Sequence, residues 1–62
     1  MDARQLATLI QRNVAVMDEI ESVLKVTNPG AGVFQFTAYQ FNGTPLVVSV
    51  VAQQPGGAAD EA

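Results

Sequence analysis

Residues 33–53 read VFQFTAYQFNGTPLVVSVVAQ. Two runs rich in β-branched and aromatic residues flank the dipeptide Asn42-Gly43, which is the preferred pair for a two-residue type I′ turn. The stretch therefore predicts a β-hairpin over residues 32–53. This turn sets a register in which Phe36 lies opposite Ser49, and Gln40 opposite Pro45. In that register both faces of the hairpin carry mainly apolar side chains.

The hairpin belongs to a long segment without charge, because no Asp, Glu, Lys or Arg occurs between Lys25 and Asp60. The charged fraction of the whole chain is 15%, whereas about a quarter is usual for soluble domains. Exposed neutral strands aggregate easily, and soluble proteins normally protect them with Lys or Pro. We therefore expect other copies of the chain or a partner protein to cover the hairpin, by its edge or by its face.

Ahead of the hairpin, apolar residues recur at helical spacing, and Asp2 with Gln5 three residues later matches a capping box. The pattern predicts a helix over residues 3–26, which stops before Pro29 because the residue before a proline disfavours helical geometry. Its apolar stripe is wider than the seam of a two-stranded coiled coil. We expect this stripe to form a helix interface of Leu6, Leu9, Ile10, Asn13, Val16, Met17, Ile20, Val23 and Leu24.

Asn13 stands in the middle of this stripe. Either it pairs with an equivalent Asn across a helix interface and fixes the register, or it lies near the stripe's edge and bonds to solvent or hairpin backbone. The orientation of neighbouring helices also stays open. Equivalent Asn residues would meet in a parallel assembly. The charges suit antiparallel neighbours instead, because the basic residues Arg4 and Arg12 lie near the start of the predicted helix and the acidic residues Asp18, Glu19 and Glu21 lie nearer its end.

Together these segments predict an α+β domain over residues 1–53, with one amphipathic helix, a two-stranded antiparallel hairpin and a flexible polar tail over residues 54–62. Because a 62-residue chain buries a modest share of its surface, and a lone hairpin is marginally stable, we expect oligomerisation or a partner to complete the fold. The expected hairpin interface comprises Phe34, Phe36, Tyr39, Phe41, Leu46, Val48, Val50 and Val51.

Side chains suited to catalysis or ligand binding are sparse. The chain has no Cys and no His, so the acidic residues Asp18, Glu19 and Glu21 lack the ligands that complete a transition-metal set. We interpret them as part of a solvated helix face. The aromatic residues have no cation beside them, which favours packing over stacking on bases. With three basic residues and a net charge of −3, no basic patch forms for nucleic acid or anionic membranes. We expect no enzyme activity, cofactor, metal or small-molecule substrate.

These exclusions favour a non-enzymatic structural or assembly protein that oligomerises, or that decorates or caps a larger complex. A virion accessory component (a decoration protein, head-fibre base, neck or tail adaptor) would be one example. The alternative is a small regulatory binding module, such as an inhibitor, an antitoxin-like protein or an enzyme accessory subunit, which docks by its hairpin. The first residues include Asp2 and lack a continuous apolar core, so we expect no signal peptide and a location in the cytoplasm or within an assembly such as a virion.

Overall fold

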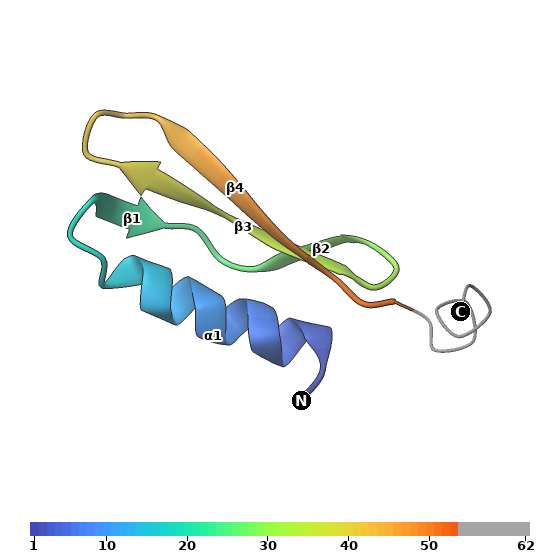
Figure 1. Ribbon diagram of the computed structural model, residues 1–62. Helices are drawn as coiled ribbons and strands as arrows, with labels where there is room; N and C mark the ends of the chain where they lie inside the picture. The colour runs from blue at the N-terminus through green and yellow to red at the C-terminus, as the bar shows by residue number, and fades with distance from the viewer. Residues whose placement is uncertain (54–62) are drawn as a thin grey trace, which may run out of the picture.

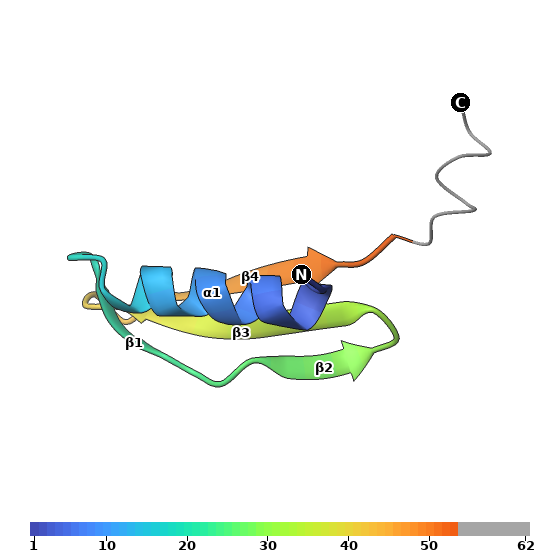
Figure 2. The same ribbon diagram turned by 90° about the horizontal axis from the view of Figure 1, so that it is seen from below.

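A computed structural model describes residues 1–53 and shows one helix laid over one face of an antiparallel sheet (Figure 1 and Figure 2). The α+β class is thus confirmed, but the sheet has four strands in this part of the chain instead of the two expected. The tail predicted over residues 54–62 lies outside the described residues. The elements are α1 (Ala3–Ala15), β1 (Ile20–Val23), β2 (Thr27–Gly30), β3 (Val33–Gln40) and β4 (Pro45–Val51).

Strand β3 is the centre of the sheet. β4 pairs along one side of β3 over its whole length, from Val33 opposite Val51 to Tyr39 opposite Pro45. β1 and β2 follow each other along the other side, β1 beside the end of β3 and β2 beside its beginning. Figure 1 shows β1 and β2 as two parts of one bent segment. The two edges of the sheet are therefore β4 and the β1–β2 segment.

The helix is shorter than the sequence predicts, because it ends at Ala15 instead of residue 26. The Met17 N–H then donates to the Val14 carbonyl (3.1 Å), and the Ile20 N–H donates to the Met17 carbonyl (3.1 Å). These turns bring residues 20–30 beside β3, where they bond to backbone groups that need partners. The observed helix has Arg12 in its last turn, where a positive charge suits the negative end of the helix dipole.

The loop of the β3–β4 hairpin has three residues instead of the expected two. The Gln40 N–H donates to the Thr44 carbonyl (3.1 Å), and the Gly43 N–H donates to the Gln40 carbonyl (2.9 Å). Gly43 has a φ of +90°, but Asn42 does not share the positive φ that a type I′ turn requires at both central residues. Instead, the Asn42 Oδ1 accepts a hydrogen bond from the Thr44 N–H (2.9 Å). The predicted type I′ turn is therefore wrong.

The pairing is consequently displaced by one residue, so that Phe36 lies opposite Val48, and Gln35 opposite Ser49. Because side chains alternate between the faces of a strand, this displacement exchanges the two faces of β4. The predicted register would have placed the Ser49 hydroxyl beside Phe36 in the core, at a cost of about 1–3 kcal/mol for an unpartnered hydroxyl. In the observed register the Ser49 Oγ lies on the opposite face and donates to the Gln35 Oε1 (3.4 Å).

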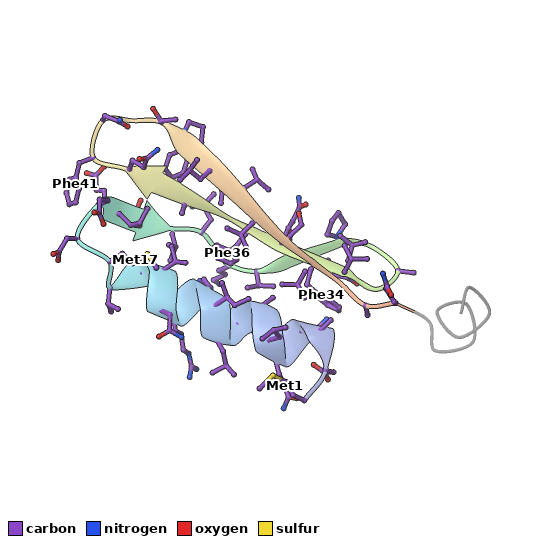
Figure 3. All side chains as sticks on the ribbon, viewed as in Figure 1. Met1, Met17, Phe34, Phe36 and Phe41 are labelled. Atoms are coloured by element: carbon purple, nitrogen blue, oxygen red, sulfur yellow. The ribbon has the colours of Figure 1, made fainter. Side chains whose placement is uncertain are left out.

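The core lies between α1 and the sheet, and Figure 3 shows Phe36 in this layer. The Phe36 side chain is 2% exposed and forms the centre of the core with Ile20 and Ala38. On the helix, Ala7 is fully buried, so a small side chain lies where the helix meets the sheet. The half-buried residues that pack against the core centre are Ile10, Val14, Val23, Val26 and Val48.

The Asp2→Ala variant is expected to be less stable than the natural chain by about 1 kcal/mol. The Asp2 Oδ1 accepts the Gln5 N–H (2.8 Å), and the Gln5 Oε1 accepts the Asp2 N–H (2.9 Å), so the substitution removes half of a capping box. Urea unfolding followed by circular dichroism would show a lower midpoint with an unchanged slope. The control is Asp2→Asn, which keeps the acceptor. An equal loss in both variants would show that the capping bond is not the cause.

Candidate protein-interaction site

The structure divides the predicted helix interface into a buried and an exposed group. Ile10 packs against the core from α1, whereas Ile20 and Val23 reach the core from β1. Because the helix ends at Ala15, the nine residues do not share one helical stripe. The exposed members are Leu6, Leu9, Asn13, Val16, Met17 and Leu24.

Asn13 forms a hydrogen bond within its own helix. Its Nδ2 donates to the Leu9 carbonyl (2.8 Å), and the residue is exposed. The side chain therefore bonds to neither the hairpin backbone nor another strand of the sheet. Pairing between equivalent Asn13 residues stays a prediction.

The predicted hairpin interface is also divided between two faces and a loop. Phe36 is buried beneath α1, so a partner has no access to it. Phe34, Val48 and Val50 share the helix side of the sheet with Phe36, since Phe34 lies opposite Val50 and Phe36 opposite Val48. Leu46 is also on this side but is exposed. The remaining members are Tyr39 and Val51 on the opposite face and Phe41 in the loop.

The face of the sheet opposite α1, here called the open face, is covered by no other element of residues 1–53 (Figure 2). Its side chains from β3 and β4 are a mixture of polar and apolar groups. Apolar and aromatic side chains are the larger part of this mixture, as the sequence predicted for both faces of the hairpin, although the observed register differs. The side chains are Val33, Gln35, Thr37 and Tyr39 from β3 and Pro45, Val47, Ser49 and Val51 from β4.

Among residues 1–53, no strand pairs with the side of β4 that faces away from β3, here called the free edge of β4. The Thr44 carbonyl accepts the Gln40 N–H at one end of the hairpin, and the Ala52 N–H donates to the Gly32 carbonyl (2.8 Å) at the other. Because hydrogen-bonded pairs alternate in an antiparallel ladder, the even-numbered residues of β4 bond to β3. Val47, Ser49 and Val51 therefore direct their backbone N–H and C=O groups away from the sheet.

The two edges of the sheet differ in how they are protected against pairing. The β1–β2 segment shifts register twice. It contains Pro29 and the charged residues Glu21 and Lys25. Irregular pairing, proline and charge all discourage the addition of another strand. β4 pairs regularly over Pro45–Val51, and its sequence PLVVSVV contains no charge and a single proline, at its first residue. The free edge of β4 is therefore the candidate interaction site.

A hollow of about 410 Å³ lies beside this edge, between the start of α1 and the end of β4. Leu6, which is 41% exposed, contributes an apolar side chain from the helix. The carboxylate of Asp2 is engaged by the Gln5 N–H. The hollow is therefore mainly apolar where it meets the β4 edge, and its lining residues are Met1, Asp2, Ala3, Leu6, Val50, Val51, Ala52 and Gln53.

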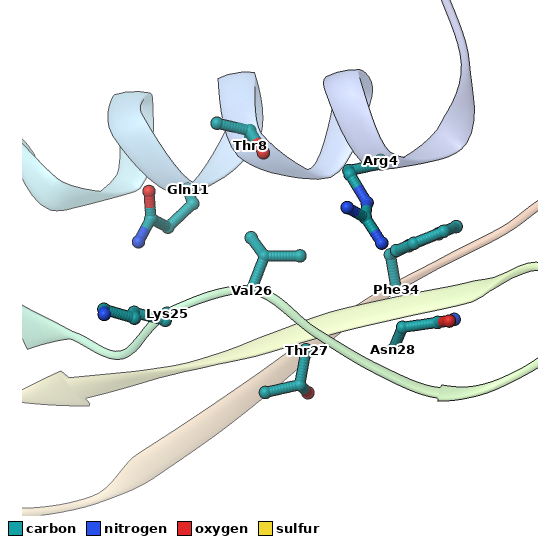
Figure 4. Close-up of a pocket in the computed structure, with 8 residues that line it drawn as sticks. All are labelled: Arg4, Thr8, Gln11, Lys25, Val26, Thr27, Asn28 and Phe34. Atoms are coloured by element: carbon teal, nitrogen blue, oxygen red, sulfur yellow. The ribbon is translucent and has the colours of Figure 1, made fainter.

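A second hollow of about 360 Å³ lies between α1 and the β1–β2 segment (Figure 4). Its two amide side chains are engaged by the protein itself: the Gln11 Nε2 donates to the Leu24 carbonyl (3.0 Å), and the Asn28 Nδ2 donates to two backbone carbonyls. The Arg4 guanidinium lies 5.3 Å from the centre of the Phe34 ring, a cation–π contact, so the expectation that no cation lies beside the aromatic residues is wrong. These interactions connect the helix and the strands, which indicates a structural role for this region.

Among residues 1–53, no group of three or more Asp and Glu side chains is placed to hold a metal ion. Within the same residues, no helix has both the length and the apolar character needed to cross a membrane. Comparison of the chain with protein-family models, curated proteins and solved structures finds no match.

Proposed function

We propose that the protein is a non-enzymatic assembly protein that associates, with copies of itself or within a larger complex, through the free edge of β4. The observation that carries this proposal is the edge itself. Over Pro45–Val51 it is regularly paired on one side, uncharged, and open on the other at the N–H and C=O groups of Val47, Ser49 and Val51. Such an edge pairs readily with another strand.

The small core supports the same proposal. The buried apolar residues of the described chain are Ala7, Ile20, Phe36 and Ala38, and two of these four are alanines. A domain of this size gains little stability from its own core, and no Cys is present to form a disulfide. Association along β4 would bury additional apolar side chains, including Val47 and Val51, which are each 61% exposed.

A second function, a regulatory module that adds β4 to the sheet of a target, is favoured by the same edge. The two functions differ in the state of the isolated protein. An assembly protein occupies its edge with another copy, whereas a module that binds one target leaves the edge free until the target is present.

Light scattering of the full chain over a dilution series tests the proposal. We expect the molar mass to be a fixed multiple of the 6.5 kDa chain at high concentration and to fall towards the monomer on dilution. A folded monomer at every concentration would contradict self-association and support the regulatory module.

A further inference from the structure

We infer that two copies of the chain pair antiparallel along β4 about a two-fold axis that passes between the Ser49 residues of the two copies. This inference rests on the proposed function and specifies its partner and its geometry. The two sheets would become one continuous sheet with a helix from each copy on the same side. The paired stretch would extend from Val47 to Val51 of each copy.

The backbone groups of β4 are compatible with this register. With Ser49 opposite Ser49 of the partner subunit, Val47 lies opposite the partner's Val51. All three odd-numbered residues are then in hydrogen-bonded pairs, which exchange two bonds each. Moving the axis to Val48 would place Pro45 opposite Val51 of the partner subunit. Because proline has no N–H, each end pair would then have one hydrogen bond, whereas every pair from Val47 to Val51 in the Ser49-centred register has two.

The side chains on the helix side are self-complementary in the Ser49-centred register. Leu46 lies on this side because it is opposite the buried Ala38, and its own side chain is 46% exposed. The two-fold axis places Leu46 opposite Ala52 of the partner subunit, whose neighbours Leu6 and Val50 line the 410 Å³ hollow. Leu46 and Ala52 are each three residues from Ser49, so one symmetry operation fills the hollows of both copies.

The distribution of charge favours a second copy over a charged partner. The chain has a net charge of −3, but β4 contains no charged residue, so its pairing brings no like charges together. An acidic or basic peptide would find no opposite charge on β4. The hollow contains Asp2, but its carboxylate caps α1 and would face the uncharged residues 46–48 of the second copy.

Cross-linking of the full-length Ser49→Cys variant tests the register. Opposite residues of a hydrogen-bonded pair have Cα atoms about 5.5 Å apart, which a disulfide spans. We expect mild oxidation to produce a covalent dimer on a non-reducing gel. The natural chain has no Cys, so any disulfide involves the introduced residue.

Val47→Cys is the matched control for this experiment. Val47 is on the same face and strand as Ser49 and is more than half exposed. In the proposed dimer the two thiols introduced by Val47→Cys are offset by four positions, roughly 14 Å along the strands, which is too far for a disulfide. Equal cross-linking of the two variants, or none at Ser49→Cys in a dimeric protein, would overturn the register.

A charge at the axis provides a second test, by light scattering. The Ser49→Lys variant places two ammonium groups at the axis, and we expect the dimer dissociation constant to rise about tenfold or more. Its circular dichroism should be unchanged because Ser49 is exposed. Ser22→Lys, also exposed but on β1, adds the same charge away from the interface and should leave the dimer intact.

The outcomes distinguish the inference from the proposed function. A natural chain that is monomeric throughout overturns the β4 dimer, and of the proposed function it leaves only association within a larger complex. A natural chain that self-associates while Ser49→Lys keeps the same dissociation constant supports an assembly role, but it overturns pairing along β4 and places the interface elsewhere than the proposed function does. Loss of association in Ser49→Lys alone, together with the Ser49→Cys cross-link, supports the β4 dimer.

Discussion

The Phe36→Ala variant is expected to lose about 3–5 kcal/mol of folding free energy. Phe36 is 2% exposed and is the largest fully buried side chain of the described residues. It packs with Ile20 and Ala38 where the helix lies on the sheet, so its removal leaves a cavity that both layers line. A domain of this length has a total stability of roughly 3–9 kcal/mol. The loss is therefore a large part of the total, and the variant should unfold at a much lower temperature than the natural chain.

Phe41→Ala is the matched control, because the Phe41 side chain is 69% exposed in the hairpin loop. We expect this variant to change the free energy of unfolding by about 0.5 kcal/mol or less. Thermal unfolding of both variants, followed by circular dichroism at equal concentration, provides the comparison. Similar midpoints for Phe36→Ala and the natural chain would show that the layer between helix and sheet is not the core.

The Ala7→Leu variant is expected to be destabilised by about 1–3 kcal/mol. Ala7 is fully buried, and a larger side chain there would push α1 away from the sheet. The helical stripe predicted from the sequence omits Ala7 and includes the neighbouring Leu6 and Leu9. If that stripe were the buried face, a leucine at position 7 would be exposed and nearly neutral.

Ala15→Leu is the control for Ala7→Leu, because Ala15 is exposed at the last position of the same helix. Chemical denaturation should give a clearly lower midpoint for Ala7→Leu and a nearly unchanged midpoint for Ala15→Leu. Equal midpoints would place the helix farther from the sheet than the structure does.

The start of the helix and the positions of β3 and β4 could be predicted because their signals are local. Asp2 and Gln5 form the capping box that their spacing indicates, and this prediction is confirmed. The end of the helix could not be predicted in the same way. Residues 16–24 keep helical spacing, yet they turn and become a strand because β3 offers backbone partners that are far away in the sequence.

In the hairpin too, a local sequence preference conflicts with the packing of residues that are farther apart in the chain. Asn42-Gly43 favours a two-residue turn, but that turn would have placed the Ser49 hydroxyl in the core. A three-residue loop resolves this conflict. The candidate site is the free edge of β4, and its lack of charge is evident in the sequence. The hollow could not be predicted, because it joins Leu6 to Ala52 across most of the chain.

The central position of β3 has a consequence for the time course of folding. β3 pairs with the segment just before it and with the strand just after it, and the turns that begin these pairings are short. Nearby segments meet at a low entropic cost, and chains with such local contacts fold quickly. A newly synthesised chain would therefore hold its uncharged strands unpaired only briefly, which shortens the interval in which aggregation competes with folding.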